Sequence, residues 1–264
     1  MARECAKIYQ LALRFHGSGE RKFADKAVEF LNAWANQHKE WAGDTDVSLR
    51  AGIYGGQMAC GAELLRDYPG WKRDDFRAFK RYMKERFYAT NKSFLEKCHG
   101  TVPSHYWSNW VNAAQASMMA IGVLCDDRKI FDEAVTYFHE GPGSENNENA
   151  VHFMHPNGLG QWQESARDQG HTLMGPALMG MTCEIAWNQG VDLYGAKDNR
   201  FLSGVEYISK YNLGHEVPWV TYVYIHCHTG KAQIFVQGEI SSHGRGMGRP
   251  GWDLVYNHYV NRRG

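Results

Sequence analysis

The chain has 264 residues, of which 43% are hydrophobic, and its 29 Lys and Arg residues balance 29 Asp and Glu residues. This length and composition are typical of a globular protein with one large domain or two small ones. The balanced charge excludes a strong general attraction to nucleic acid, and no apolar run of about 18 residues is present to span a membrane.

Helical periodicity dominates the first four-fifths of the chain. Residues 1–15 form an amphipathic pattern without the apolar core of a signal peptide. Residues 22–37 carry apolar side chains from Phe23 to Trp34 on one helical face, and residues 47–65 are apolar nearly all round. Further helices are predicted over residues 74–88, 107–124, 128–138, 163–190 and 199–212.

Helices rich in small residues alternate with charged amphipathic helices, and turns marked by Gly or Asp join them. This alternation predicts an array of helical hairpins with inner and outer helices. Such an array can curl into an incomplete (α/α) toroid around a cleft, and a plain helical bundle is the alternative.

Two regions depart from this helical pattern, an internal loop and the C-terminal fifth of the chain. Residues 139–160 are rich in Gly, Pro and Asn and predict a loop. Residues 217–228 and 232–240 alternate β-branched and aromatic side chains, which predicts short strands. A Gly-rich loop and a closing helix over 252–261 follow, so we predict a mainly α fold with a few C-terminal strands, in a single domain over 1–264.

The cysteines give no metal or redox motif. The six Cys residues include no C-x-x-C pair, and their disulfide state stays open. The H-x-H segment from His226 to His228 lacks a third ligand, so we interpret it as structural. Phosphate-loop, G-x-S-x-G and H-E-x-x-H motifs are also missing, which disfavours nucleotide binding, serine hydrolysis and zinc proteolysis.

The stretch GQWQESARDQGHT, residues 160–172, concentrates polar groups. On a helix, Gln161, Glu164, Asp168 and His171 would share one face, with Arg167 beside it. A solvated helix face is the alternative. Because the helix continues into an apolar segment, we favour a face that lines a cleft.

Two other groups contain candidate functional residues. Asn109 lies with other amides on the predicted helix 107–124, where a core amide is the alternative. Near the C-terminus, Arg249, Tyr256 and His258 lie close in sequence, where packing is the alternative role for the tyrosine.

Several motifs in order carry a resemblance to a known family. The segments QESARDQGHT, EIAWNQGVDLYG and GRPGWDLVYNHYV resemble the alginate lyase domain family, and the branch that looks closest is polysaccharide lyase family 38. The resemblance runs from about residue 8 to the C-terminus. Relatives carry a further N-terminal segment, which we expect this chain to lack.

The resemblance implies metal-independent β-elimination on a 1,4-linked polyuronate such as alginate or glucuronan. That reaction needs donors or a protonated acid to neutralise the uronate carboxylate, a base for the C5 proton and an acid for the O4 leaving group. It implies an anionic polysaccharide as partner, with no cofactor, metal, nucleic acid or membrane. Because such polymers are extracellular, it also implies a secreted enzyme.

The resemblance also suggests catalytic roles for individual residues. Asn109 matches an inner-helix Asn that faces the substrate carboxylate. Glu164 and His171 occupy positions where another branch carries Arg and Tyr, which suggests that Glu164 helps neutralise the uronate and His171 is a base or further donor. Tyr222 is the first candidate for the acid–base tyrosine, and Tyr256 is the second.

Further residues are expected to bind the polymer. Arg249 is the expected cation for substrate carboxylates, and Tyr54 and Gln57 are expected to line subsites. Arg167, Gln161 and His258 complete the predicted substrate-binding set.

Two other functions remain open. One is a glycoside hydrolase that pairs Glu164 with Asp168 or Asp253. The other is a catalytically inactive domain that binds polyuronate.

Overall fold

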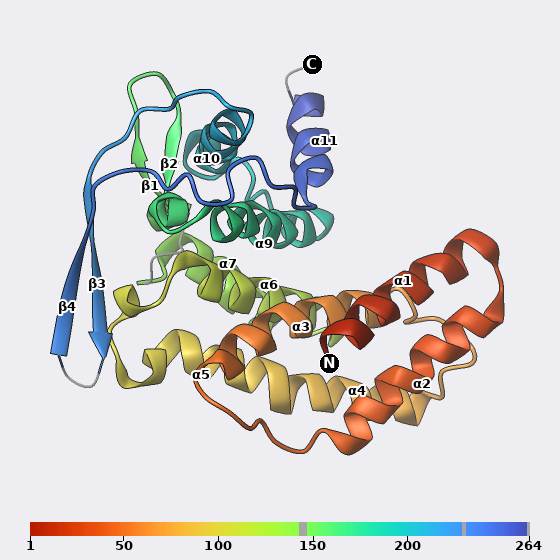
Figure 1. Cartoon of the computed structure of the whole chain (residues 1–264). Helices are drawn as coiled ribbons and strands as arrows, with labels where there is room; N and C mark the ends of the chain where they lie inside the picture. Colours follow the sequence, from red (N-terminus) through yellow and green to blue (C-terminus); the bar gives the residue numbers. More distant parts are fainter. Residues whose placement is uncertain (143–146, 229–230, 263–264) are drawn as a thin grey trace. The chain divides into compact units, whose positions relative to one another are not determined.

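The computed structural model describes residues 1–142, 147–228 and 231–262 (Figure 1). The chain divides into two compact units, one of residues 1–96 with 113–135 and the other of residues 97–112 with 136–264. Helix α6 (Ser108–Leu124) begins in the second unit and ends in the first.

The first unit is built of helices. Gly19 ends the first helix in the left-handed conformation, with φ of 71°, and its N–H donates to the Phe15 carbonyl. This geometry lets the second helix turn back along the first. Besides the C-terminal part of α6, the helices that lie wholly or mostly in this unit are α1 (Ala2–Ser18), α2 (Arg21–Gln37), α3 (Asp46–Glu63), α4 (Arg73–Tyr82), a π-helix η1 (Met83–Tyr88), α5 (Ala89–Lys97) and α7 (Arg128–Glu140).

Small residues in α3 allow α6 to approach closely. A Cβ added at Gly52 would lie 2.6 Å from the Ala113 carbonyl carbon, a distance that real side chains do not tolerate. The small-residue pattern of residues 47–65 therefore reflects a close helix contact, as expected for a buried helix.

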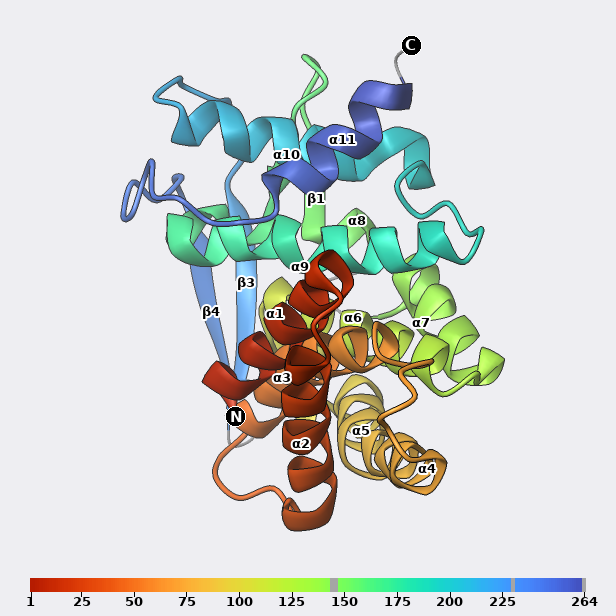
Figure 2. The ribbon, with the colours of Figure 1, turned by 90° about the vertical axis from the view of Figure 1, so that its right-hand side faces the viewer.

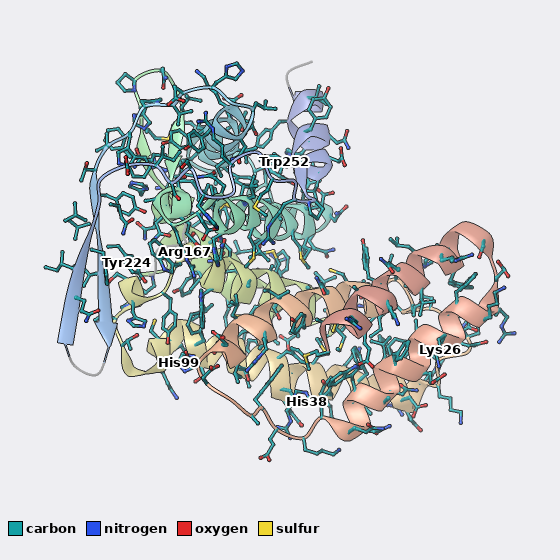
Figure 3. The ribbon with its side chains drawn as sticks, in the orientation of Figure 1. Lys26, His38, His99, Arg167, Tyr224 and Trp252 are labelled. Atoms are coloured by element: carbon teal, nitrogen blue, oxygen red, sulfur yellow. The ribbon has the colours of Figure 1, made fainter. Side chains whose placement is uncertain are left out.

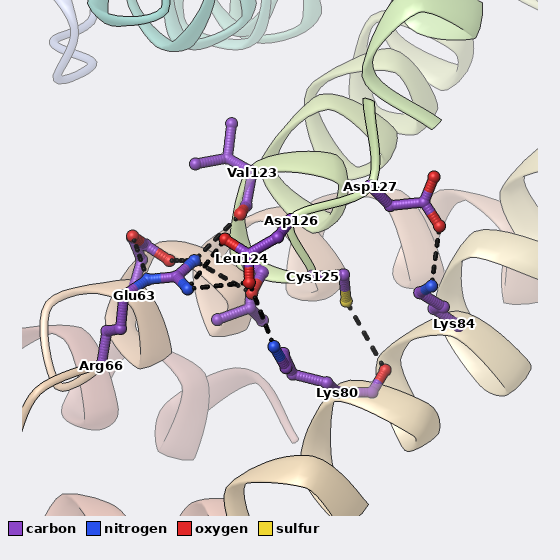
Figure 4. Close-up of polar contacts among 9 residues, drawn as sticks. All are labelled: Glu63, Arg66, Lys80, Lys84, Val123, Leu124, Cys125, Asp126 and Asp127. Atoms are coloured by element: carbon purple, nitrogen blue, oxygen red, sulfur yellow. Dashed lines mark hydrogen bonds and ion pairs between the residues drawn. The ribbon is translucent and has the colours of Figure 1, made fainter. Parts of the chain in front are cut away.

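A charged network holds the C-terminal end of α6 (Figure 4). Arg66 donates to the carbonyls of Val123 and Leu124 at 3.0 Å each, and it pairs with Asp126 at 3.0 Å. Lys80 joins the same aspartate at 3.1 Å. Arg66 thus satisfies the last carbonyls of the helix, where the helix dipole favours positive charge.

The second unit combines helices with two small sheets. Strands β1 (Val151–Met154) and β2 (Gly160–Trp162) pair antiparallel, as do β3 (Tyr222–His228) and β4 (Lys231–Gln237). Helices α10 and α11 both contact α9, and Figure 2 shows α10 running beside α9 and α11 oblique to it. The other elements are the 3₁₀ helices η2 (Cys98–Gly100), η3 (Pro103–His105) and η4 (Gln163–Ala166), and the α-helices α8 (Asn147–Ala150), α9 (Gln169–Asn188), α10 (Ala196–Asn212) and α11 (Trp252–Arg262).

Trp162 is the central core residue of the second unit. Its side chain is fully buried, and it fills a notch left by Gly175 of α9 and Gly204 of α10. A Cβ at either glycine would meet the indole ring. The polar residues that follow Trp162 are therefore attached to a rigid point of the core.

The prediction of a mainly α fold with a few short strands is confirmed. The predicted strands and closing helix near the C-terminus match β3, β4 and α11, whereas the predicted loop 139–160 also contains α8 and β1. Closure into a toroid and the single-domain organisation stay predictions. Within the described ranges, none of the helices has both the length and the apolar character needed to cross a membrane.

Candidate active site

The polar stretch 160–172 is not one helix, so the prediction that its residues share a helical face is wrong. Gln161 lies in β2 and Glu164 in η4. Asp168 has extended backbone angles, with φ of −171° and ψ of 163°, and is the N-cap of α9. His171 lies in the first turn of that helix. Asp is a favoured N-cap residue, so its helix boundary was available from sequence.

The Glu164 carboxylate is fully buried against the start of α6. Its Oε1 accepts hydrogen bonds from the Asn109 N–H at 2.7 Å and from the Ser108 hydroxyl at 3.1 Å. Burial raises the pKa of Glu164, and these donors oppose the shift. Glu164 thus occupies the N-terminal end of α6, where orphan N–H groups favour a negative charge, and it has no surface open to substrate.

Asn109 connects the starts of two helices. Its amide nitrogen donates to the His171 carbonyl at 2.8 Å, and its side chain is 1% exposed. The nitrogen that was predicted to face the substrate carboxylate is therefore already bonded within the protein. Its Oδ1 is buried and has no hydrogen-bond partner among the described residues.

Asp168 holds the His171 side chain. Asp168 Oδ1 accepts from the His171 backbone N–H at 2.8 Å, and Oδ2 lies 2.5 Å from His171 Nδ1. Burial alone would raise the pKa of Asp168, but hydrogen bonds from His171 hold it below its ordinary value. The His171 side chain is 42% exposed, so it is accessible to a ligand.

Arg167 is a partly exposed cation with two supports. Its Nη1 donates to Glu164 Oε2 at 3.2 Å, and its guanidinium lies 5.4 Å from the centre of the Trp107 ring. Trp107 stacks in turn on Tyr224 of β3, with ring centres 3.9 Å apart. In Figure 3, the labelled Arg167 and Tyr224 lie on the same side of the second unit. The side chain of Arg167 remains 31% exposed, so this cation is held in place and can still be reached.

Tyr222 reaches the same region from β3. Its hydroxyl donates to the carbonyl of Gln163, the residue before Glu164. Burial raises the pKa of Tyr222, and the Glu164 carboxylate adds to the shift. The phenol therefore keeps its proton, which suits a general acid.

Gln161 has a structural environment rather than the predicted substrate contact. It is fully buried, and its amide makes bonds of 2.8 Å to both the N–H and the carbonyl of Val220. His155 and His152 occupy its remaining positions, each at 3.2 Å. Gln161 thus fixes the chain that leads into Tyr222.

The three C-terminal candidates do not join this group. Arg249 is exposed in the Gly-rich loop. Tyr256 is 66% exposed and lines a separate apolar cavity of about 620 Å³ with residues of α9, α10 and α11. The His258 ring stacks on Tyr194 with ring centres 3.6 Å apart. Tyr256 therefore lines a cavity, and His258 packs against Tyr194.

The remaining predicted residues lie elsewhere. Tyr54 and Gln57 are half-buried on α3 in the first unit, and their subsite role stays a prediction. Among the residues that the structure describes, no three His, Cys, Asp or Glu side chains are grouped to hold a metal. The side chains of the H-x-H segment, 226–228, lie outside that description.

Sequence reasoning missed two supporting residues. Ser108 is the first residue of the apolar helix α6, and Ser is a residue type that marks a helix start, but its donation to Glu164 joins segments 56 residues apart. Trp107 gave no signal of its own, because its contacts with Arg167 and Tyr224 arise only in the folded chain.

Comparisons with known proteins agree with the helical fold. The family model described as alginate lyase matches residues 1–219, so the match ends just before Tyr222. A solved structure of alginate lyase A1-III, a tyrosine-to-phenylalanine variant complexed with a tetrasaccharide, is similar with a TM-score of 0.60 and 16% identity. The similarity covers 78% of this chain and 57% of that one, and at this identity it shows the fold alone. None of the curated proteins matches this chain.

Proposed function

The chain belongs to the alginate lyase family, and we propose that it cleaves a 1,4-linked polyuronate, such as alginate or glucuronan, by metal-independent β-elimination. One observation carries the proposal. Arg167, His171 and Tyr222 are all tied to the segment around the buried contact between Glu164 and Asn109. A cation, an imidazole and a protonated phenol can supply the three functions that this reaction requires, which are neutralisation of the carboxylate, a base and an acid. We place the chain with polysaccharide lyase family 38 as part of this proposal.

Neutralising the substrate carboxylate is the first requirement. Loss of the C5 proton develops negative charge next to the uronate carboxylate, so that carboxylate must first be paired with a donor. Arg167 fits this role because Glu164 and Trp107 fix its guanidinium while part of it stays exposed. The guanidinium geometry favours two-point binding of a carboxylate.

Proton transfer is the second requirement. His171 takes the proton from C5, the C–H electron pair becomes the C4–C5 double bond, and the bond from C4 to O4 breaks. Tyr222 gives its proton to the departing O4. Burial keeps the Tyr222 phenol protonated, and the proton that it donates to the Gln163 carbonyl would be redirected to the substrate.

The same proposal defines the partner and the place of action. The partner is an anionic polysaccharide, in keeping with the tetrasaccharide named for the similar solved structure. Polymers of this kind lie outside cells, so we propose that the protein acts extracellularly. EDTA should leave its activity unchanged, because Arg167 supplies the positive charge.

A substrate panel tests the proposal. Alginate, its mannuronate-rich and guluronate-rich fractions, and glucuronan are incubated with the protein, and unsaturated ends are followed by ultraviolet absorbance. Tyr222→Phe should lose about 10²- to 10⁴-fold in kcat, the usual contribution of a general acid or base. The matched control is Tyr256→Phe, which removes a hydroxyl from an exposed tyrosine on α11 and should keep full activity.

The assay also separates the alternatives. New reducing ends without ultraviolet absorbance would identify a glycoside hydrolase, and binding without turnover would identify an inactive domain. The burial of Glu164 and the pairing of Asp168 with His171 argue against a hydrolase that uses these two acids, and the assay decides about an inactive domain. Equal losses in Tyr222→Phe and Tyr256→Phe would contradict the assignment of Tyr222.

A further inference from the structure

The two bonds between Asp168 and His171 have different consequences. The bond from the His171 backbone N–H to Oδ1, at 2.8 Å, caps α9. Any good N-cap side chain could make it. The contact of 2.5 Å between Oδ2 and Nδ1 involves the imidazole ring itself. Capping therefore does not explain the second contact.

That second contact determines where the imidazole proton lies. An ionised carboxylate only accepts hydrogen bonds, so Nδ1 must carry a proton wherever Asp168 is charged. In the neutral ring the other nitrogen, Nε2, then has a free lone pair. Among the described residues no side chain bonds to Nε2, so it is available to a ligand.

The charged surroundings keep Asp168 ionised. Burial raises the pKa of Asp168, but the two bonds from His171 and the nearby positive charge of Arg167 lower it by a larger amount. The net effect is a pKa below the ordinary value. Glu164 is the other acid that faces the imidazole, and it is held by donors from α6. Asp168 is thus the only carboxylate that touches the ring within the described part of the chain.

We propose that Asp168 is a positioning residue that fixes His171 in its Nδ1–H form, so that Nε2 accepts the C5 proton of the uronate. This inference rests on the proposed lyase function for the role of His171. Asp168 does not touch the substrate in this account. Its effect passes through the imidazole, by selecting one tautomer and, once the proton has been taken, by pairing with the imidazolium.

Asp168→Asn separates capping from tautomer selection. Asn keeps an oxygen that accepts from the His171 N–H and is itself a good N-cap. Its NH₂ group would replace Oδ2 and donate to Nδ1, which moves the ring proton to Nε2. The base would then be lost while the helix start is kept. We expect kcat to fall about 10²- to 10⁴-fold with little change in KM.

The matched control is Asp127→Asn. Asp127 also precedes a helix, α7, and its Oδ1 accepts from the Ile130 N–H at 3.4 Å. It touches no imidazole in the described structure, and its other partner is Lys84. Asp127→Asn should therefore lose some stability and keep its kcat. Equal losses of kcat in the two variants would overturn the proposal.

Nitrogen NMR of ¹⁵N-histidine-labelled protein provides a readout that needs no turnover. The His171 signals, identified by their loss in His171→Gln, should show the proton on Nδ1 in the wild type and on Nε2 in Asp168→Asn. A wild-type proton on Nε2, or an unchanged tautomer in the variant, would overturn the proposal. If Asp168→Asn does not fold, Asp168→Ser keeps the cap and removes Oδ2, and it should show both tautomers.

The two proposals can fail separately. If the wild type cleaves no polyuronate while the spectra show the Nδ1–H form, the lyase function fails and the selection of the tautomer by Asp168 stands. If cleavage occurs but the tautomer does not respond to Asp168, the positioning role fails and the lyase function stands.

Discussion

The histidine next to Gln161 should make the second unit sensitive to acid. Gln161 Oε1 accepts from the Val220 N–H at 2.8 Å, so its nitrogen is the atom that faces His152 Nε2 at 3.2 Å. An amide N–H can only donate, and His152 Nε2 must therefore be an unprotonated acceptor. Protonation would bring two donors together and break this contact.

The magnitude follows from the shift in protonation. Burial, helped by the positive charge of Arg200, lowers the pKa of His152 from its ordinary 6.5 to about 4. Between these values the unfolded chain binds more protons than the folded chain, so stability falls as pH falls. One pKa unit corresponds to about 1.4 kcal/mol, so the loss between pH 6.5 and pH 4 is about 3 kcal/mol. This is a large share of the roughly 5–15 kcal/mol that stabilises an ordinary domain.

Urea unfolding of wild type and His152→Gln across this pH range measures the effect. The Gln oxygen can replace Nε2 as acceptor from Gln161, and the new side chain cannot titrate. Loss of the ring lowers the starting stability of the variant, so the comparison uses only the change with pH. We expect the advantage of the wild type to shrink by about 3 kcal/mol between pH 6.5 and pH 4. Parallel curves for the two proteins would refute the reasoning.

Two further predictions concern the buried carboxylate and the core. Glu164→Gln keeps an oxygen for the N–H groups of α6 and removes a carboxyl whose pKa burial raises. The wild type should therefore lose stability relative to this variant as pH rises above about 4.5, measured by urea unfolding, and a gain would contradict the burial argument. Gly175→Ala places a methyl group against Trp162 and should destabilise by about 1–3 kcal/mol in thermal unfolding. In the control Gly17→Ala no atom lies within 4 Å of the new Cβ, so the stability should stay unchanged or rise by up to about 1 kcal/mol. Equal changes in stability at the two glycines would show that the contact with Trp162 is not the cause.

Most helices could be predicted because apolar periodicity is a local property. The predicted helices 22–37 and 252–261 differ from α2 and α11 by one residue at one end. The predicted helix 74–88 contains a change that the pattern does not reveal, since α4 ends at Tyr82 and a π-helix continues to Tyr88. Buried residues continue from Phe79 and Tyr82 of α4 to Met83 and Phe87 of the π-helix, so hydrophobic spacing alone does not detect the change.

The site was only partly predictable, because its contacts join distant segments. Glu164 and Asn109 were each identified from sequence, but their contact spans 55 residues and gives both a buried position. The spacing of Glu164 and His171 fits a helix as well as it fits a turn followed by a helix. The N-cap preference of Asp168 was the local signal that distinguishes the two.

The positions of the two acids suit a site for a polyanion. Free carboxylates beside a uronate chain would repel it, yet Glu164 and Asp168 both lie next to the groups proposed for catalysis. Each is placed at the N-terminus of a helix, α6 or α9, and receives a backbone N–H from it, at 2.7 Å and 2.8 Å. Helix N-termini stabilise negative charge, and the positive charge of Arg167 opposes the rise that burial causes in the Glu164 pKa and helps to lower the Asp168 pKa. The negative charges are thereby used to hold Arg167 and His171, whose side chains remain partly exposed. The exposed parts of Arg167 and His171 thus offer a guanidinium and an imidazole to an anionic ligand, while Glu164 has no exposed surface and Asp168 is paired with His171.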